Sequence, residues 1–327
     1  MNLHLNLLVS VIIQKYFLNS RCIIYFSEKF NSLDYTGPIP ILQINVQNMN
    51  IHKDLIFRYF GCQGIIISNN LPIWTFEIFE KLIRLSSERF NTRRYLILSG
   101  NNPKENLTDI FNIKELTHIS NMVIIEEYKR KRKKTTGKQY IMDQKHITYI
   151  VSTHGYVGLK NNNRRIILDF WSSNLKKFKF NNNLFPNKLL NQMGRELRMA
   201  TFHYEPYSII GSTEDTHKGS EMSVALTFAR QYNMTPVPVI NKEDYWGEIF
   251  TNWSGNGLLG NLVLDKADIG FGALYTWEVD YHYLDLSKPL VRTGITCLVP
   301  APKYVSQNMQ EVTKFYDNET KKKIHDG

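Results

Sequence analysis

The sequence has few cysteines and no long hydrophobic run. Cys22, Cys62 and Cys297 are too few for a disulfide scaffold and lack the spacing of metal ligands. We predict one disulfide between Cys22 and Cys62, with Cys297 reduced and buried in a strand, because cysteines flanked by apolar residues usually serve as core residues. No run of about 18 apolar residues occurs, so the chain is not expected to cross a bilayer as a helix.

Catalytic and metal-binding motifs are also missing. The nine histidines include no pair four residues apart around a glutamate, and no Gly-x-Ser-x-Gly elbow occurs. Gly255 to Gly260 fits the dinucleotide fingerprint, but no clean strand precedes it, so we expect these glycines to permit a tight entry into a short helix. We predict no enzyme, no catalytic residue, no metal and no cofactor.

The positive charge is concentrated in one place. Lys and Arg number 40 against 30 Asp and Glu, for a formal charge of +10, and six of the basic residues form an unbroken run from Lys129 to Lys134. Such a run is usually a solvated loop, and no aromatic residue interrupts it to stack on bases. We therefore expect no nucleic-acid partner.

The pattern of apolar residues predicts two α/β domains in the 327 residues. Short apolar runs alternate with amphipathic segments between residues 60 and 127, which predicts a βαβαβ order. The predicted strands are Gly64 to Ser68, Tyr95 to Gly100 and Met122 to Glu127, with helices at Thr75 to Phe90 and near Glu105 to Leu116. Further strands are predicted to begin at Ile147 and Arg165.

A polar joint at Asn181 to Asn183, followed by Pro186, predicts a domain boundary near residue 185. The segments after it predict a second βαβαβ unit: a strand at Leu197 to Phe202, a helix from Ser220, a strand at residues 236–240, a helix at Leu258 to Leu264 and a strand at Ala267 to Gly272. At the start of the chain, Leu5 to Ile13 is apolar, and both a signal-peptide core and a buried strand remain open for it.

The stretch from Leu197 to Lys303 resembles the first half of the ligand-binding domain of ionotropic glutamate receptors. LRMATFHYEPYSII resembles the opening strand and its Pro-aromatic turn, and GSEMSVALTFARQYNM the first long helix. GNGLLGNLVLDKADIGFGALY resembles the helix and strand that follow, and YLDLSKPLVRTGITCLV, from Tyr283 to Val299, is the most specific match. DYWGEIFTNWSGNGLLG is similar to the divergent ionotropic receptors of insects.

This resemblance implies an α/β fold with three parts. Residues 1–185 form an N-terminal α/β extracellular domain, residues 186–303 form the first segment of a two-lobed ligand-binding domain like a periplasmic binding protein, and residues 304–327 are expected to be an aberrant polar tail. It implies the extracellular portion of a ligand- or stimulus-gated cation-channel subunit for chemical, thermal or humidity sensing, located at the plasma membrane of sensory neurons. The implied partners are other receptor subunits in a hetero-oligomeric channel and an unknown small ligand. A secreted solute-binding protein without a channel, or a truncated product with no function of its own, are the alternatives.

The resemblance also names candidate ligand-binding residues. In the family, an arginine grips the carboxylate of the ligand, but Asp280 stands at that position, while Ala273 and Tyr275 replace the upstream Pro and Thr. A carboxylate repels another carboxylate, so glutamate is an improbable ligand. The aromatic residue that stacks on the ligand is retained as Tyr207, for which packing within the lobe is the alternative. The candidates are Tyr207, Tyr275 and Asp280.

Four Asn-x-Ser/Thr triplets are candidates for glycosylation. They begin at Asn106, Asn233, Asn252 and Asn318. Sugars on asparagine are added to secreted and cell-surface proteins, so these triplets agree with a secretory route.

Overall fold

The computed structural model describes residues 3–28, 33–46, 62–84, 92–99, 104–128, 147–159, 163–213, 216–275 and 277–290. Residues 1–286 form one compact unit, and residues 287–327 are grouped apart from it. The basic run, Cys297, Asn318 and the tail 304–327 lie outside the described residues. Among the described helices, none is long and apolar enough to cross a membrane.

A large, mostly parallel sheet makes up most of the N-terminal part. Its order is β2-β1-β3-β4-β5-β6-β7-β8, in which β1 to β5 pair in parallel and β6 to β8 continue the sheet antiparallel. The strands are β1 (Cys22–Ser27), β2 (Ile41–Asn45), β3 (Cys62–Asn69), β4 (Arg94–Ser99), β5 (Met122–Glu127), β6 (Thr148–His154), β7 (Arg165–Ser172) and β8 (Lys177–Phe178). The order 2-1-3-4-5 is that of doubly wound, flavodoxin-like sheets. The predicted α/β class is confirmed.

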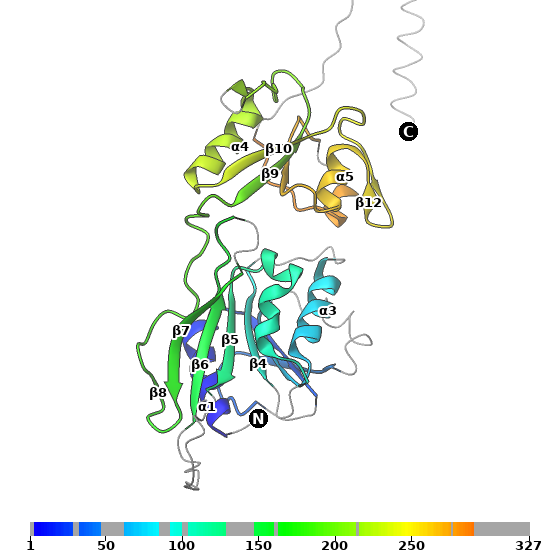
Figure 1. Ribbon diagram of the computed structural model, residues 1–327. Helices are drawn as coiled ribbons and strands as arrows, with labels where there is room; N and C mark the ends of the chain where they lie inside the picture. The colour runs from blue at the N-terminus through cyan, green and yellow to red at the C-terminus, as the bar shows by residue number, and fades with distance from the viewer. Residues whose placement is uncertain are drawn as a thin grey trace, which may run out of the picture. The chain divides into compact units, whose positions relative to one another are not determined.

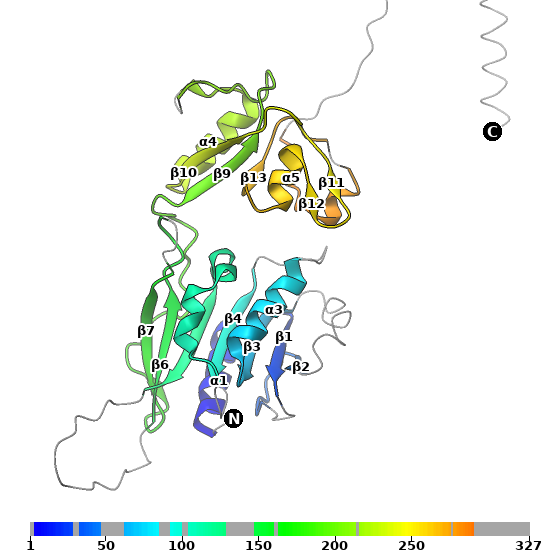
Figure 2. The ribbon, with the colours of Figure 1, turned by 45° about the vertical axis from the view of Figure 1, so that its right-hand side comes forward.

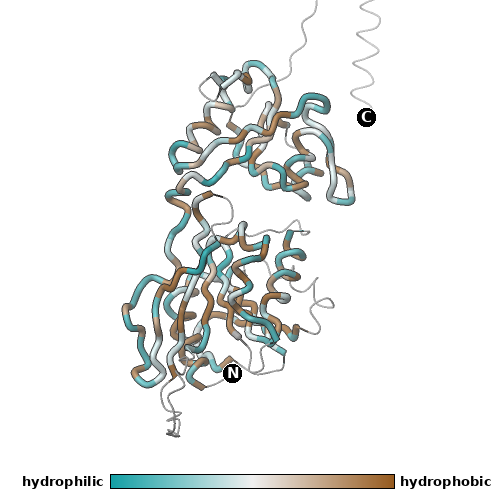
Figure 3. Tube along the Cα trace, in the orientation of Figure 1, coloured by the Kyte–Doolittle hydropathy of each residue, from teal (hydrophilic) through white to brown (hydrophobic). Residues whose placement is uncertain are grey.

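Helices cover both faces of this sheet. Helix α3 (Pro72–Arg84) packs with Ile24 and Phe26, and helix α1 (Leu3–Tyr16) packs with Ile23 and Tyr25 of the same strand. Successive residues of a strand point to opposite faces, so both faces of β1 are buried. That is why the parallel strands are hydrophobic along their length rather than alternating, as the brown stretches in Figure 3 show. Figures 1 and 2 show the two helices on opposite sides of the sheet.

The apolar stretch near the N-terminus is helical. Leu8, Val9, Ile12 and Ile13 of α1 are fully buried. These positions repeat at four residues, which places them on one face of a helix. The buried-strand interpretation of Leu5 to Ile13 is therefore wrong, and the signal-peptide interpretation stays a prediction.

The helix predicted near Glu105 to Leu116 is also wrong in type. The structure has two 3-10 helices there, η2 (Leu107–Asn112) and η3 (Lys114–His118), separated by an extended Ile113. The apolar residues of this segment recur every third position: Leu107, Ile110, Ile113, Leu116 and Ile119. A repeat of three matches the three residues per turn of a 3-10 helix, so each of these side chains can reach the core.

The predicted disulfide between Cys22 and Cys62 is present. It links β1 and β3, in which the two cysteines are register partners at the start of each strand. The bond therefore closes a loop that contains β2 and ties together two neighbouring strands of the large sheet.

A small parallel sheet follows, with the order β10-β9-β13. Its elements are β9 (Glu196–Thr201), α4 (Ser220–Gln231), β10 (Thr235–Ile240), α5 (Gly257–Val263) and β13 (Ile269–Gly270), with the short hairpin β11 (Ile249–Phe250) and β12 (Ser254–Gly255) before α5. Helix α4 packs with Leu197 and Met199, whereas α5 packs with Ala200 and Phe202. The second predicted βαβαβ order is confirmed, and the boundary near residue 185 stays a prediction.

Two local details differ in extent from the sequence prediction. The strand expected at Ala267 to Gly272 is paired only at Ile269–Gly270, because the chain turns away through Ala273, which has a positive φ of 53°. Gly257 opens α5 with a φ of 64°, and a Cβ there would lie 2.5 Å from the backbone of Gly247. The expectation that a glycine permits tight entry into this short helix is thus confirmed.

Candidate ligand-binding site

The fold places a candidate site at the carboxyl ends of β9 and β13. The chain leaves β9 for β10 on one side and then crosses to β13 on the other. In open α/β sheets, ligands bind at such a switch point, outside the carboxyl ends of the strands. Here these ends lead into the segment after Thr201 and the segment after Gly270.

A tight hairpin after β9 closes over the start of helix α4. The carbonyls of Pro206 and Tyr207 accept hydrogen bonds from the backbone N–H groups of Ser220, Glu221 and Met222, at 3.1 to 3.2 Å. Gly219 precedes them with a φ of 113°, and a Cβ there would lie 2.3 Å from the Tyr207 carbonyl oxygen. These N–H groups are the ones a helix leaves unpaired, and they are already satisfied within the protein.

Aromatic rings gather beside this hairpin. Tyr204 and Tyr207 stack with ring centroids 5.7 Å apart and planes 13° apart, and the ring of Trp246 meets Tyr204 edge-on at 5.3 Å. Phe202 lies beneath them, 4.9 Å from Trp246. Tyr204 remains 38% exposed. The structure therefore places Tyr207 in an aromatic cluster, formed by Phe202, Tyr204, Tyr207 and Trp246, at the edge where a ligand would bind.

One peptide group connects this cluster to the first turn of α4. Trp246 Nε1 donates to the carbonyl of Gly272 at 2.8 Å, and the N–H of Ala273 donates to Glu221 Oε2 at 2.9 Å. The carbonyl and the N–H belong to the same peptide unit, so Trp246 and Glu221 hold it from opposite sides. Glu221 makes no ion pair within the part of the chain that the structure describes.

The other two candidates lie further along the chain. Tyr275 is 57% exposed, and Asp280 begins the 3-10 helix η5 (Asp280–His282), where burial raises the pKa of its carboxyl group. Among the described residues, no hydrogen bond, ion pair or ring contact joins either of them to Tyr207. The structure does not bring the three candidates together. Tyr207 instead contacts Tyr204 and Glu221, and Tyr204 in turn contacts Trp246. The resemblance did not single out any of these three residues as a ligand-binding candidate.

The glycosylation candidates within the described residues lie at the surface. Asn106, Asn233 and Asn252 are all exposed. Asn106 caps η2 by accepting a hydrogen bond from the N–H of Thr108, and Asn252 Oδ1 accepts hydrogen bonds from Ser254. In both triplets, the asparagine contacts the hydroxyl residue of its own motif.

The carboxyl ends of β1 and β3 form a second switch point. Carboxylate side chains of the protein itself accept hydrogen bonds there. Glu105 accepts hydrogen bonds from the N–H groups of Ile73 and Trp74, at 2.7 and 3.3 Å, at the start of α3. Glu28 accepts two from Asn70. A carboxylate of the chain thus already occupies the N-terminus of α3, where an anion would otherwise bind the N–H groups of Ile73 and Trp74.

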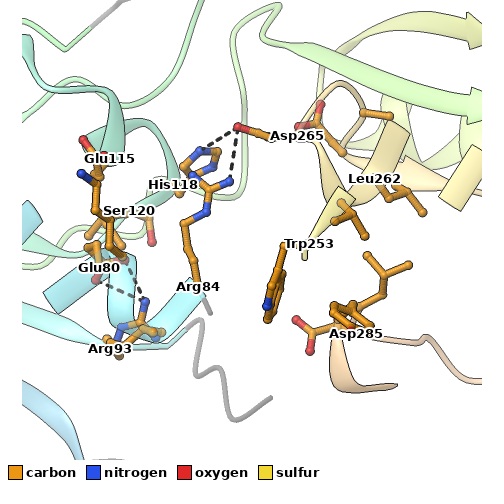
Figure 4. A pocket seen from close by; sticks show the side chains of 18 residues that line it. Glu80, Arg84, Arg93, Glu115, His118, Ser120, Trp253, Leu262, Asp265 and Asp285 are labelled. Atoms are coloured by element: carbon orange, nitrogen blue, oxygen red, sulfur yellow. Dashed lines mark hydrogen bonds and ion pairs between the residues drawn. The ribbon is translucent and has the colours of Figure 1, made fainter. Parts of the chain in front are cut away.

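A cavity of about 590 Å³ lies near the end of α3, η3 and the segment after α5, and charged side chains line much of it. Asp265 is the centre of one group: Arg198 Nη2 lies 3.0 Å from it, with His118, Arg84 and Lys114 at 3.6 to 3.7 Å. Figure 4 shows Arg84 and His118 pointing toward Asp265. Hydrogen bonding to His118 and Arg198 lowers the pKa of the Asp265 carboxyl group far below its usual range.

A buried polar triad forms another wall of this cavity. Arg93 pairs with Glu80 at 3.2 Å and donates from Nε to the hydroxyl of Tyr95 at 3.1 Å, and that hydroxyl donates to Glu80. The side chains of Arg93 and Glu80 are only 9% and 5% exposed. The buried charges of this wall pair with one another, so removing one partner would leave the other charge buried and unpaired.

A half-buried amine and a buried imidazole lie side by side near the end of β6. Lys188 Nζ donates to the hydroxyl of Thr153 at 2.8 Å, next to the fully buried His154. Burial lowers the pKa of Lys188 to about 7. Burial, together with the charges of Lys188 and Arg195, lowers the pKa of His154 to about 3.

These shifts predict how stability depends on pH. Lys188 has a pKa of about 7 in the folded state and 10.5 as its ordinary value, so between these values the unfolded chain binds more protons and stability rises with pH. The same argument applies to His154 between pH 3 and 6.5. Lys188→Met is expected to remove the rise above pH 7 and to leave the one below 6.5, as measured by urea unfolding at a series of pH values. An unchanged slope above pH 7 would show that Lys188 is solvated.

The chain was compared with known protein families and with curated proteins. No family model matches the chain. A search of curated proteins finds no match either. The function proposed below therefore depends on the ordered resemblance within the sequence and on the arrangement of the residues described above.

Proposed function

We propose that this chain is the extracellular portion of a ligand- or stimulus-gated cation-channel subunit that senses chemical, thermal or humidity signals. Residues 186–303 would supply the first segment of its two-lobed ligand-binding domain. The proposal is supported mainly by the ordered resemblance between Leu197 and Lys303. Its second support is the aromatic cluster around Tyr207, which lies at the carboxyl edge of a parallel sheet, where ligands of such folds bind.

The mechanism rests on closure of two lobes. A ligand bound at the carboxyl edge of β9 and β13 would contact a second lobe and favour the closed arrangement, because it interacts more strongly with that state. Closure would then pull on the connections to the pore. The other subunits of a hetero-oligomeric channel are the proposed partners, and the plasma membrane of sensory neurons is the proposed location.

Glutamate is expected not to bind. The N–H groups at the start of α4 bond to the hairpin carbonyls, and the N–H of Ala273 bonds to Glu221, so the donors that could hold a ligand carboxylate are in use. The resemblance places the family's arginine at Asp280, so the guanidinium that would hold the carboxylate of the ligand is missing at that position. Titration calorimetry with glutamate is expected to show no saturable heat for the wild type. Saturable binding at micromolar concentration would contradict this argument, and Asp280→Arg measures the contribution of that guanidinium.

Transcripts of the same locus test the channel proposal. The longest open reading frame is expected to encode apolar stretches of about 20 residues followed by a second lobe segment. Expressed in oocytes together with other receptor subunits, this product is expected to carry a cation current evoked by amines, temperature or humidity. Transcripts that all lack such stretches would instead support the secreted solute-binding protein, or a truncated product without its own function.

Glycosylation is expected when the chain passes through the secretory pathway. Asn106 and Asn252 are exposed and accessible to the modifying enzyme. Removal of N-glycans from the secreted protein is expected to lower its mass, and Asn106→Gln with Asn252→Gln together are expected to reduce that shift. A protein that is secreted without any glycan would contradict the prediction.

A further inference from the structure

We propose that the edge formed by Tyr204, Tyr207, Trp246 and Glu221 binds a small organic cation, such as an alkylammonium ion. This inference rests on the proposed function, because it names the ligand class of the same edge. The inference follows from two observations: the N–H groups of this edge are already hydrogen-bonded, whereas its aromatic rings and the Glu221 carboxylate could contact a cation.

The backbone N–H donors at this edge, which could bind an anion, are already hydrogen-bonded within the protein. Backbone N–H groups are the usual anion ligands at a helix start, but those of Ser220, Glu221 and Met222 bond to the hairpin carbonyls. The N–H of Ala273 bonds to Glu221. His203, in the same hairpin, lies 3.6 Å from Glu205. An anion that bound these N–H groups would therefore have to displace existing hydrogen bonds.

The same edge offers two groups that attract a cation. The first is the aromatic cluster, in which Tyr204 and Tyr207 stack, Trp246 stands edge-on to Tyr204, and Tyr204 remains 38% exposed. A cation over the face of such a ring is attracted by the negative centre of the ring. The second is Glu221, whose Oε2 accepts one hydrogen bond and which has no ion-pair partner among the described residues.

The rings and the carboxylate are fixed relative to one another. Trp246 and Glu221 bond to the two ends of the Gly272–Ala273 peptide group, at 2.8 and 2.9 Å. The backbone of Glu221 is also tied to the carbonyl of Tyr207 at 3.1 Å. Because the groups are held in place before a ligand arrives, little conformational entropy is lost on binding.

A titration of residues 1–327 with choline tests the proposal. Choline carries a quaternary ammonium group, and 3,3-dimethyl-1-butanol has the same shape without the charge. The indole N–H signal of Trp246, assigned with Trp246→Phe, reports on the edge in nitrogen-15 NMR spectra. Choline is expected to shift this signal saturably, and the neutral analogue is expected not to.

Variants separate the two attractions. Glu221→Gln keeps an oxygen that accepts from Ala273 and is expected to weaken choline binding about fivefold, the size of one partly exposed ion pair. Tyr204→Leu is expected to weaken it by removing a ring. Glu205→Gln removes a carboxylate from the same hairpin and is expected to have no effect. Spectra that keep the wild-type pattern outside this edge show that each variant is folded.

Three results would overturn the proposal: no saturable shift with choline, equal shifts with the neutral analogue, or unchanged affinity in Glu221→Gln. None of them bears on whether the locus encodes a pore, which the transcript experiment decides. Conversely, choline binding by a protein whose locus encodes no membrane segment would keep this inference about the edge while rejecting the channel.

Discussion

Replacing Arg93 with methionine is expected to lower the free energy of unfolding by about 3–5 kcal/mol. The substitution leaves the Glu80 carboxylate buried, at 5% exposure, without its cation. It also removes a hydrogen bond to the hydroxyl of Tyr95, which is fully buried. Urea unfolding of the wild type and the variant at neutral pH measures the difference.

Two controls make this result interpretable. Arg84→Met removes a guanidinium that is 45% exposed and lies 3.7 Å from Asp265, and such a pair contributes about 1 kcal/mol or less. The double variant Glu80→Leu with Arg93→Met leaves no unpaired charge, so it is expected to be more stable than Arg93→Met alone. A loss similar to that of Arg84→Met would mean that Glu80 is hydrated when Arg93 is absent.

Replacing both Cys22 and Cys62 with serine is expected to lower the stability by about 4 kcal/mol. The two cysteines are 40 residues apart, and the disulfide restricts the unfolded chain by closing a loop of that length. Thermal or urea unfolding under oxidising conditions gives the difference between the wild type and the double variant.

Reduction provides the matched control for the disulfide. A reducing agent is expected to lower the stability of the wild type toward that of the double serine variant and to leave the variant unchanged. If reduction has no effect on the wild type, the cysteines are not bonded in solution.

Most regular elements could be predicted because their hydrophobic patterns are local. The apolar runs of β3, β4 and β5 stand between polar segments, and the buried face of α4 repeats at helical spacing in Met222, Ala225, Leu226 and Ala229. The strand β1 was missed, although its CIIYFS run is as apolar as the others. Its pairing with both β2 and β3 depends on tertiary contacts rather than on its own pattern.

The 3-10 helices show a signal that was present but assigned to the wrong period. Leu107, Ile110 and Leu116 are all buried, and their positions differ by multiples of three. An α-helix would turn these residues progressively away from the core, because it has 3.6 residues per turn. A repeat of three, followed over five positions, would have indicated the tighter helix from the sequence alone.

The candidate site was only partly accessible to sequence reasoning. Tyr207 was found because it stands at a recognisable place in an ordered resemblance. Trp246 and Glu221 were not, because the peptide group of Gly272 that connects them is reached from two other segments, 26 and 52 residues away. Contacts at such separations follow from how the chain folds back, and one sequence does not display them.

The far edge of the large sheet has a consequence for association between molecules. An open strand edge offers unpaired N–H and C=O groups to any other extended chain, which is a common route to aggregation. Here β7 exposes Ile166 and Ile167, at 37% and 52%, which would favour such recruitment. The strand β8 pairs with the end of β7 through two residues, one of which is the exposed Lys177. Beyond it, Lys179 and Asn182 donate hydrogen bonds to the carbonyls of Phe170 and Leu168. A short strand with a lysine is a poor template for pairing with another chain. Addition of further strands is therefore opposed at the C-terminal end of β7 and least opposed near Ile166.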